Sequence, residues 1–138
     1  MADDALLAAY RRTRFCADTV QGRVVIRVGE TCPQLDALLC ATGCARWAYL
    51  TAFNPGSVRL TDDQNHARQR ELEDAVRQLQ HLMFLGEGIG DDGTWPPEPS
   101  ILVLGIEREA AVQLGRQFRQ SAIVCGERGG PAALILCE

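Results

Sequence analysis

Five polar side chains surround one turn of the sequence and are candidates for a binding site. Thr51, Asn54 and Ser57 follow an apolar run, while Asn65 and Arg68 fall on the inward face of a predicted helix. Because an unpaired buried polar group costs roughly 1–3 kcal/mol, we expect the two sets to meet. Two interpretations stay open: a hydrogen-bond network that pins the loop, or a ligand crevice beyond the end of a strand.

The segment GEGIGDDGTWPPEPS, residues 86–100, is the second place where chemistry is conceivable. Its glycines look like a dinucleotide loop, but no helix follows, so we expect an ordinary loop. Trp95 is expected to be either a lid over a site or a clamp that holds this loop on the core. Glu98 is the candidate partner of Arg68, because an inward-facing guanidinium needs carboxylate or carbonyl acceptors.

No metal or cofactor is expected, and catalytic residues stay unknown. The acidic residues of this region miss the spacing of a calcium loop: they are Glu87, Asp91, Asp92 and Glu98. Three cysteines miss the spacing of zinc knuckles: they are Cys32, Cys40 and Cys44. The two histidines accompany no nucleophile motif such as G-x-S-x-G.

The residues before the long helix predict a capped helix N-terminus. Thr61 and Gln64 have the spacing of a capping box. Asp62 and Asp63 occupy the first turn, where they outweigh the roughly half positive charge of the helix end. The sequence therefore favours a helix cap over a phosphate site.

The surrounding pattern predicts a single mixed α/β (α+β) domain over residues 1–138. Apolar runs predict strands at 23–28, 46–53 and 101–106, and a C-terminal hairpin formed by 121–126 and 131–137. Helical patterns cover about 4–13, 33–43, 62–81 and 107–119. Because strands and helices alternate, we expect a mixed sheet of about five to six strands covered by helices.

Composition limits the classes of partner. The formal net charge is −4. Because proteins that bind nucleic acids usually present a basic face, we do not expect a nucleic-acid partner. No apolar run reaches the roughly 18 residues of a membrane span, and the first ten residues lack a signal-peptide pattern. We expect a cytoplasmic protein whose six cysteines are reduced, with Cys16, Cys125 and Cys137 in or beside apolar strands.

Four motifs in this order resemble a bacterial family catalogued as domain of unknown function 3293. They are YLTAFNPGS (49–57), Asn65 with Arg68, WPPEPSILVLGI (95–106) and FRQSAIV (118–124). Arg119 stands where a glycine is expected before Gln120. The resemblance implies no activity, but it nominates a polar signature consisting of Asn54, Ser57, Asn65, Arg68, Glu98 and Gln120.

These residues support three hypotheses about function. The first is a module that binds a small polar ligand or a protein partner at the Asn54–Arg68 crevice. The second is an enzyme acting on a nucleotide or nucleic acid, with Glu98 as general acid/base and Arg68 as electrostatic stabiliser. The third is a purely structural polar clamp. The ligand, the substrate and the oligomeric state stay open.

Overall fold

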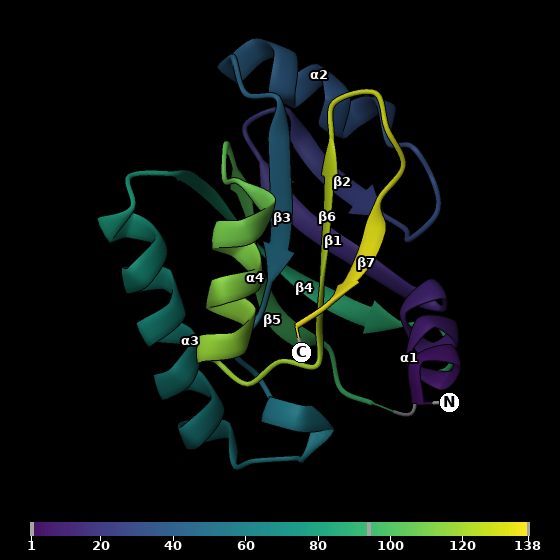
Figure 1. Ribbon diagram of the computed structural model, residues 1–138, viewed down its shortest axis with the longest axis vertical. Helices are drawn as coiled ribbons and strands as arrows, with labels where there is room; N and C mark the ends of the chain where they lie inside the picture. The colour runs from purple at the N-terminus through teal and green to yellow at the C-terminus, as the bar shows by residue number, and fades with distance from the viewer. Residues whose placement is uncertain (1, 94, 138) are drawn as a thin grey trace.

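The computed structural model describes residues 2–93 and 95–137. Figure 1 shows how the helices surround one sheet. The helices are α1 (Ala2–Arg11), α2 (Pro33–Thr42), α3 (Asp62–Gln78) and α4 (Arg108–Gln117), with a short 3-10 turn, η1 (Pro55–Ser57). The strands are β1 (Thr13–Thr19), β2 (Gly22–Ile26), β3 (Arg46–Leu50), β4 (Leu82–Gly90), β5 (Glu98–Leu104), β6 (Ala122–Glu127) and β7 (Ala133–Leu136).

The strands form one seven-stranded sheet in the order β2-β1-β4-β5-β3-β6-β7, and each neighbouring pair is antiparallel. The prediction of a mixed helix-and-strand fold with a C-terminal hairpin, β6–β7, is confirmed. The predicted number of strands and the mixed strand direction are wrong. The helix α3 joins β3 to β4, and α4 joins β5 to β6, so each crossover skips one strand. This β-α-β-β-α-β order is the split βαβ arrangement.

The sheet curls until its two edges touch at one point. Val28, which follows β2, forms an isolated parallel bridge with Ala132, which precedes β7. The N–H of Gly29 donates to the carbonyl of Ala132 at 2.8 Å, and the N–H of Ala132 donates to the carbonyl of Glu30 at 3.0 Å. The curl gives the sheet an inner and an outer face.

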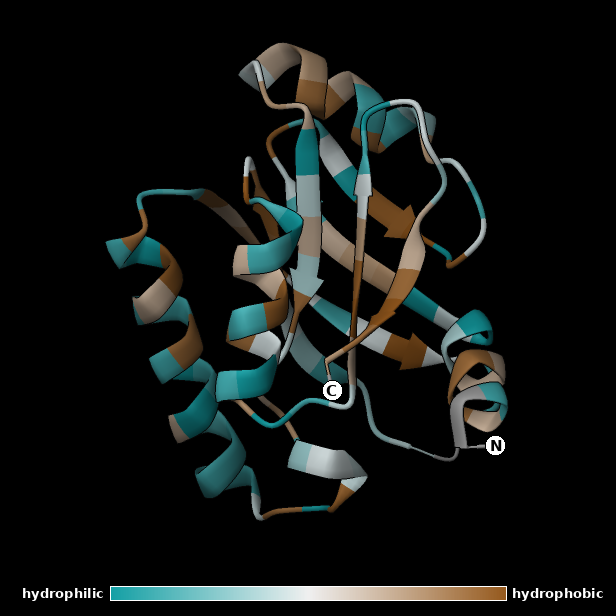
Figure 2. Ribbon diagram, in the orientation of Figure 1, coloured by the Kyte–Doolittle hydropathy of each residue, from teal (hydrophilic) through white to brown (hydrophobic). Residues whose placement is uncertain are grey.

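Apolar residues cover both faces of the sheet. The inner cluster joins strand residues to α2, and its fully buried members include Ile26, Leu38, Leu39 and Leu102. The outer cluster lies beneath α3 and α4, and its fully buried members include Leu72, Val76, Ile101 and Val103. Figure 2 shows this division, with apolar residues concentrated in the strands and many hydrophilic residues on α3 and α4. Among the described residues, no helix is long and apolar enough to cross a membrane.

Local signals place two helices where the sequence predicts them. The hydroxyl of Thr61 accepts the N–H of Gln64 at 3.2 Å, and the Gln64 side chain accepts the N–H of Thr61 at 3.1 Å. The helix α2 begins at Pro33, and its C-cap is Gly43, whose φ of 71° is left-handed. The capping box and the Pro-to-Gly span are therefore confirmed.

Two strands were not predicted from the sequence. The strand β1 pairs with both β2 and β4, and β4 occupies 82–90, partly within the predicted loop. Residues 86–90 are therefore the end of a strand in the interior of the sheet. This end of β4, together with the beginnings of β1, β5 and β6, surrounds a cavity on the inner face.

Candidate functional site

A cavity of about 380 Å³ lies between α1 and the inner face of the sheet. Its walls come from α1, from the beginnings of β1, β5 and β6, from the ends of β3 and β4, and from the segments that follow β3 and β4. In Figure 1 the arrowhead of β4 points toward α1, and the N–H of Asp91 donates to the carbonyl of Arg12 at 2.8 Å. The volume falls within the roughly 300–1,000 Å³ that is typical of small-molecule sites.

Aromatic rings form much of the cavity wall. The protein has four Phe, two Trp and two Tyr residues, and five of these eight line the cavity: Tyr10, Phe15, Tyr49, Phe53 and Trp95. The ring centroids of Tyr10 and Phe15 are 5.7 Å apart, and those of Phe15 and Tyr49 are 5.3 Å apart. These spacings are typical of packed aromatic pairs. Tyr10, Phe15 and Tyr49 therefore form one packed aromatic part of the wall.

Of these five rings, only Trp95 was singled out from the sequence. The signal for Tyr49 was present, because Thr51 was a candidate and residues two apart in a strand face the same side. Tyr10 belongs to a different helix and Phe15 to a strand that was not predicted. Their place in the site depends on the curl of the sheet, which brings β1 opposite the end of β3.

Glycines at the end of β4 leave this space open. Gly88 and Gly90 both line the cavity, and Gly88 lies opposite Phe15 on one side and Glu98 on the other. A Cβ atom at Gly88 would meet only side-chain atoms of Phe15 and Thr13, at 3.8–3.9 Å. Side chains larger than hydrogen at these positions would project into the cavity, so the glycines set its size.

Gly86 has a different role in the same strand. A Cβ atom there would lie 1.8 Å from the carbonyl oxygen of Cys16 in β1. The two backbones can approach this closely only because residue 86 has no side chain. The interpretation of GEGIG as loop glycines is therefore wrong, because these residues are part of the sheet.

Glu98 presents a carboxylate at the cavity wall. Its Oε2 accepts a hydrogen bond from Nδ2 of Asn54 at 2.8 Å and one from Nε1 of Trp95 at 2.7 Å. Glu98 begins β5, and its side chain is half-buried. Two donors from separate segments thus orient one carboxylate oxygen.

Asn54 is itself held from several sides. Its backbone N–H donates to Oδ1 of Asn65 at 2.9 Å, and its Oδ1 accepts from Nδ2 of Asn65 at 2.8 Å and from the N–H of Leu60 at 3.0 Å. Asn54 has a left-handed φ of 48°, a conformation that asparagine tolerates better than most residues. Asn65 therefore positions Asn54 from behind, as the predicted meeting of strand end and helix requires.

Gln69 extends this network by one helical turn and was missed in the sequence analysis. Its Oε1 accepts the N–H of Ala52 at 2.9 Å. It follows Asn65 by four residues, which places both on one helix face, and this spacing was the available signal. Its buried Nε2 has no hydrogen-bond partner among the described residues.

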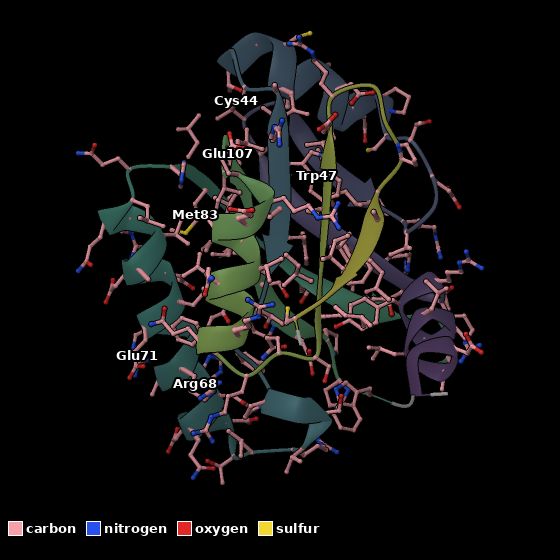
Figure 3. All side chains as sticks on the ribbon, in the orientation of Figure 1. Cys44, Trp47, Arg68, Glu71, Met83 and Glu107 are labelled. Atoms are coloured by element: carbon pink, nitrogen blue, oxygen red, sulfur yellow. The ribbon has the colours of Figure 1, made fainter. Side chains whose placement is uncertain are left out.

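Arg68 points from α3 toward the end of α4, as Figure 3 shows. Its Nε donates to the carbonyl of Ala52 at 2.9 Å, and its NH2 group donates to the carbonyl of Phe118, the C-cap of α4. Its guanidinium carbon also lies 5.9 Å from the centroid of the Phe118 ring. The predicted pairing with Glu98 is wrong, since carbonyl oxygens accept its hydrogen bonds and no described ion pair joins it to Glu98.

The predicted polar cluster therefore divides into two groups. Five members line the cavity: they are Thr51, Asn54, Ser57, Glu98 and Gln120. The other two, Asn65 and Arg68, are not among its lining residues and act as a clamp behind it.

The side chains of two lining residues form hydrogen bonds to backbone carbonyls. The hydroxyl of Thr51 donates to the carbonyl of Pro99 at 2.8 Å, and Nε2 of Gln120 donates to the carbonyl of Phe53 at 3.1 Å. Ser57 is exposed and ends η1 with a φ of 64°. These bonds tie the segment after β3 to its neighbours and give the cavity a firm rim.

Trp95 is held on two sides, at the edge and at the face of its ring. Its indole N–H is bonded to Glu98, and the guanidinium carbon of Arg59 lies 5.1 Å from its ring centroid. Arg59 does not line the cavity, whereas Trp95 does. The loop that carries Trp95 is thus attached through both the edge and the face of the indole ring.

The wall contains two tyrosines whose hydroxyls stay protonated well above neutral pH. Burial raises the pKa of Tyr10 to about 12, and the nearby charge of Glu98 adds to this effect. Burial also raises the pKa of Tyr49, whose hydroxyl donates to the carbonyl of Cys16 at 2.7 Å. Both therefore behave as neutral hydrogen-bonding groups at the cavity.

The described residues include no group of three His, Cys, Asp or Glu side chains placed to hold a metal ion. All six cysteines are free, and three of them, Cys16, Cys125 and Cys137, are buried. Burial raises the pKa of the Cys125 and Cys137 thiols. These thiols are therefore apolar packing groups rather than nucleophiles.

Comparison with known proteins identifies a family for the chain. The family described as "Protein of unknown function (DUF3293)" matches residues 50–123, slightly more than half of the chain. This range includes all seven residues of the predicted polar cluster. No curated protein and no solved structure matches the chain.

Proposed function

This chain belongs to the DUF3293 family of proteins of unknown function, and we propose that it binds a small organic molecule in the cavity between α1 and the sheet. The observation that carries the proposal is the wall itself. Five aromatic residues line the cavity together with Glu98, whose carboxylate is oriented by Asn54 and Trp95. Apolar walls with a few oriented polar groups are typical of small-molecule sites.

The clamp behind the wall supports the same proposal. A ligand site gains affinity when its polar groups are already held in the bound geometry. Asn65 fixes Asn54, which in turn fixes Glu98. The rim is attached to neighbouring segments by Thr51 and Gln120. We infer that little ordering remains to be done when a ligand enters.

The enzyme hypothesis with Arg68 as stabiliser has less support. Arg68 does not line the cavity, and its guanidinium is bonded to two backbone carbonyls. It would have to leave both carbonyls to reach a reacting group beside Glu98. We therefore propose a binding module. The reducing cytoplasm is the proposed compartment, because the six cysteines are free thiols and three are buried.

A thermal-shift screen of diverse small molecules tests the binding proposal. A ligand at one hundred times its Kd stabilises a protein by about 2.7 kcal/mol, so some compounds should raise the unfolding temperature by several degrees. The matched variant is Gly88→Val, whose side chain would project into the cavity from a site where a Cβ meets only side-chain atoms at 3.8–3.9 Å.

The variant should unfold at or above the temperature of the wild type and lose the response to the same compounds. Stabilisation that is equal in both proteins would place the ligands elsewhere. A screen without any compound that depends on Gly88 would contradict the proposed function.

A further inference from the structure

Glu98 forms no ion pair with a basic side chain among the described residues. On the neighbouring strand β4, Glu87 lies 3.6 Å from the guanidinium of Arg23, and Asp91 just beyond it lies 3.1 Å from that of Arg27. No ion pair within residues 2–93 and 95–137 involves Glu98, although its side chain is half-buried. Hydrogen bonds and a neighbouring positive charge both offset the cost of burying a carboxylate, and the described residues supply only the hydrogen bonds to Glu98.

The two hydrogen bonds to Glu98 orient it without neutralising it. An amide N–H from Asn54 and an indole N–H from Trp95 both reach Oε2. Neither donor carries a formal charge. Arg68 of the clamp is bonded to carbonyls and does not line the cavity. Arg59 lies over the face of Trp95 and forms no described ion pair with Glu98. The Glu98 side chain therefore lines the cavity with two hydrogen-bond donors on one oxygen and no described ion pair.

The rest of the lining favours a positive ligand as well. Its charged members are Glu98, Asp92 and Arg12, so acidic groups outnumber basic ones. Aromatic faces attract cations through their ring quadrupole. The Trp95 ring already shows this affinity, since the Arg59 guanidinium lies over it at 5.1 Å. A carboxylate at one wall and aromatic faces at the others together fit a compact organic cation.

We propose that the natural ligand is a small organic cation, either an alkylammonium or an alkylguanidinium compound. Its charged group would lie against the Glu98 carboxylate and its hydrocarbon part against the rings of Tyr10, Phe15 and Tyr49. This inference rests on the proposed binding function and names the ligand class for that cavity. A phosphorylated ligand fits poorly, because Glu98 would repel it and Arg12 is the only basic residue among the described lining residues.

Isothermal titration calorimetry with matched probe pairs tests the ligand class. Butylguanidinium is compared with butylurea, and pentylammonium with pentanol, so that each pair shares its size and differs in charge. At least one cation should bind roughly tenfold or more tighter than its neutral counterpart, which corresponds to about 1.4 kcal/mol. Raising the salt concentration should weaken binding of the cation more than that of the neutral probe.

The matched variant is Glu98→Gln, which keeps the size of the side chain and an oxygen acceptor but removes the charge. In this variant the cation should lose its preference over the neutral probe. Arg12→Ala is the opposite control, since it removes a positive charge from the lining and should leave cation binding equal or tighter. Should Glu98→Gln fail to fold, the salt dependence of the wild type and Arg12→Ala still decide the matter.

The outcomes separate this inference from the proposed function. Neutral probes that bind as tightly as cations, in a manner that Gly88→Val abolishes, would overturn the cation preference and leave the binding cavity standing. A cation preference that survives in Glu98→Gln would also overturn the inference, as would the failure of every cationic probe to bind. The proposed function itself is judged by the broader screen for compounds that depend on Gly88.

Discussion

Replacing Arg68 with alanine should destabilise the protein because it removes a clamp between three segments. The Arg68 side chain extends from α3 and bonds the carbonyl of Ala52, after β3, and that of Phe118, at the end of α4. Both accepting residues are buried. The positive charge also lies at the C-terminal end of α4, where the helix dipole favours cations.

The size of the effect follows from these contacts. Hydrogen bonds that involve a charged group contribute roughly 1.5–3 kcal/mol each, so two would set an upper range of about 3–6 kcal/mol. Arg68 is only half-buried, and water could reach part of the space that the side chain leaves. We therefore expect a loss of about 3 kcal/mol. With an unfolding entropy of about 2.1 cal/mol/K per residue, this corresponds to a fall in Tm of roughly 10 °C.

Urea unfolding followed by circular dichroism measures this loss, with Arg70→Ala as the matched control. Arg70 lies on the same helix, is exposed, and has no described hydrogen bond or ion pair. Its replacement should change the free energy of unfolding by no more than about 0.5 kcal/mol. If Arg68→Ala costs no more than Arg70→Ala at equal m-values, the two carbonyl bonds do not hold the fold and the clamp is refuted.

Three further predictions concern the pH dependence, the strand glycines and the helix cap. Burial raises the pKa of Tyr10 to about 12 and also raises that of Tyr49. As the pH rises, the unfolded chain therefore loses these two protons at a lower pH than the folded protein. The contribution to the free energy of unfolding is complete below the ordinary tyrosine pKa of about 10 and falls as the pH rises above it. Tyrosinate absorbance should therefore appear together with unfolding, and a normal titration in the folded protein would contradict this. Gly88→Ala should leave the unfolding temperature unchanged or raise it slightly. Gly86→Ala should prevent stable folding, because its Cβ would lie 1.8 Å from a backbone oxygen. Equal unfolding temperatures for the two variants would show that β4 adjusts to the added methyl group. Thr61→Ala should cost about 1 kcal/mol in denaturant unfolding, as expected for a lost N-cap, and an unchanged midpoint would show that the cap is dispensable.

The beginning of α3 and both ends of α2 were predictable from the sequence because their signals are local, whereas the predicted ends of the first helix, 13, and of the long helix, 81, lie beyond Arg11 and Gln78. Thr61 and Gln64 specify the beginning of α3, and Pro33 and Gly43 delimit α2. Each signal acts through backbone groups within a few residues, so no knowledge of the tertiary structure is required. The same holds for the hairpin β6–β7, whose two apolar runs flank a short turn.

The strand β4 could not be predicted from local signals, because its glycines are required by contacts with residues that are distant in the sequence. Gly86 permits close approach to β1, and Gly88 leaves space beside Phe15. Neither requirement is written in the neighbouring residues, so glycine propensity alone indicates a loop. The sequence predicted a sheet with some parallel neighbours because α3 and α4 each join two strands that run in the same direction. An antiparallel strand lies between each of these pairs, β5 in one and β3 in the other.

The candidate site was predicted in part for the same reason. Asn54 and Asn65 meet as expected because a strand end and a helix face are close in the sequence. The partner of Arg68 could not be deduced, since the carbonyl of Phe118 arrives from a helix fifty residues later. Tyr10 and Phe15 enter the site only through the curl of the sheet, which no local pattern specifies.

We propose that the cavity between α1 and the sheet binds a small molecule. The most direct measurement is a titration of isotope-labelled protein with a compound from the thermal-shift screen, followed by amide nitrogen–proton NMR spectra. We predict that the largest shifts occur at the lining residues Gly88, Gly90, Ser100 and Gln120, and that exposed residues of α3 such as Arg70 stay unchanged. Shifts concentrated on α3, or no shifts at the cavity for any stabilising compound, would contradict the account.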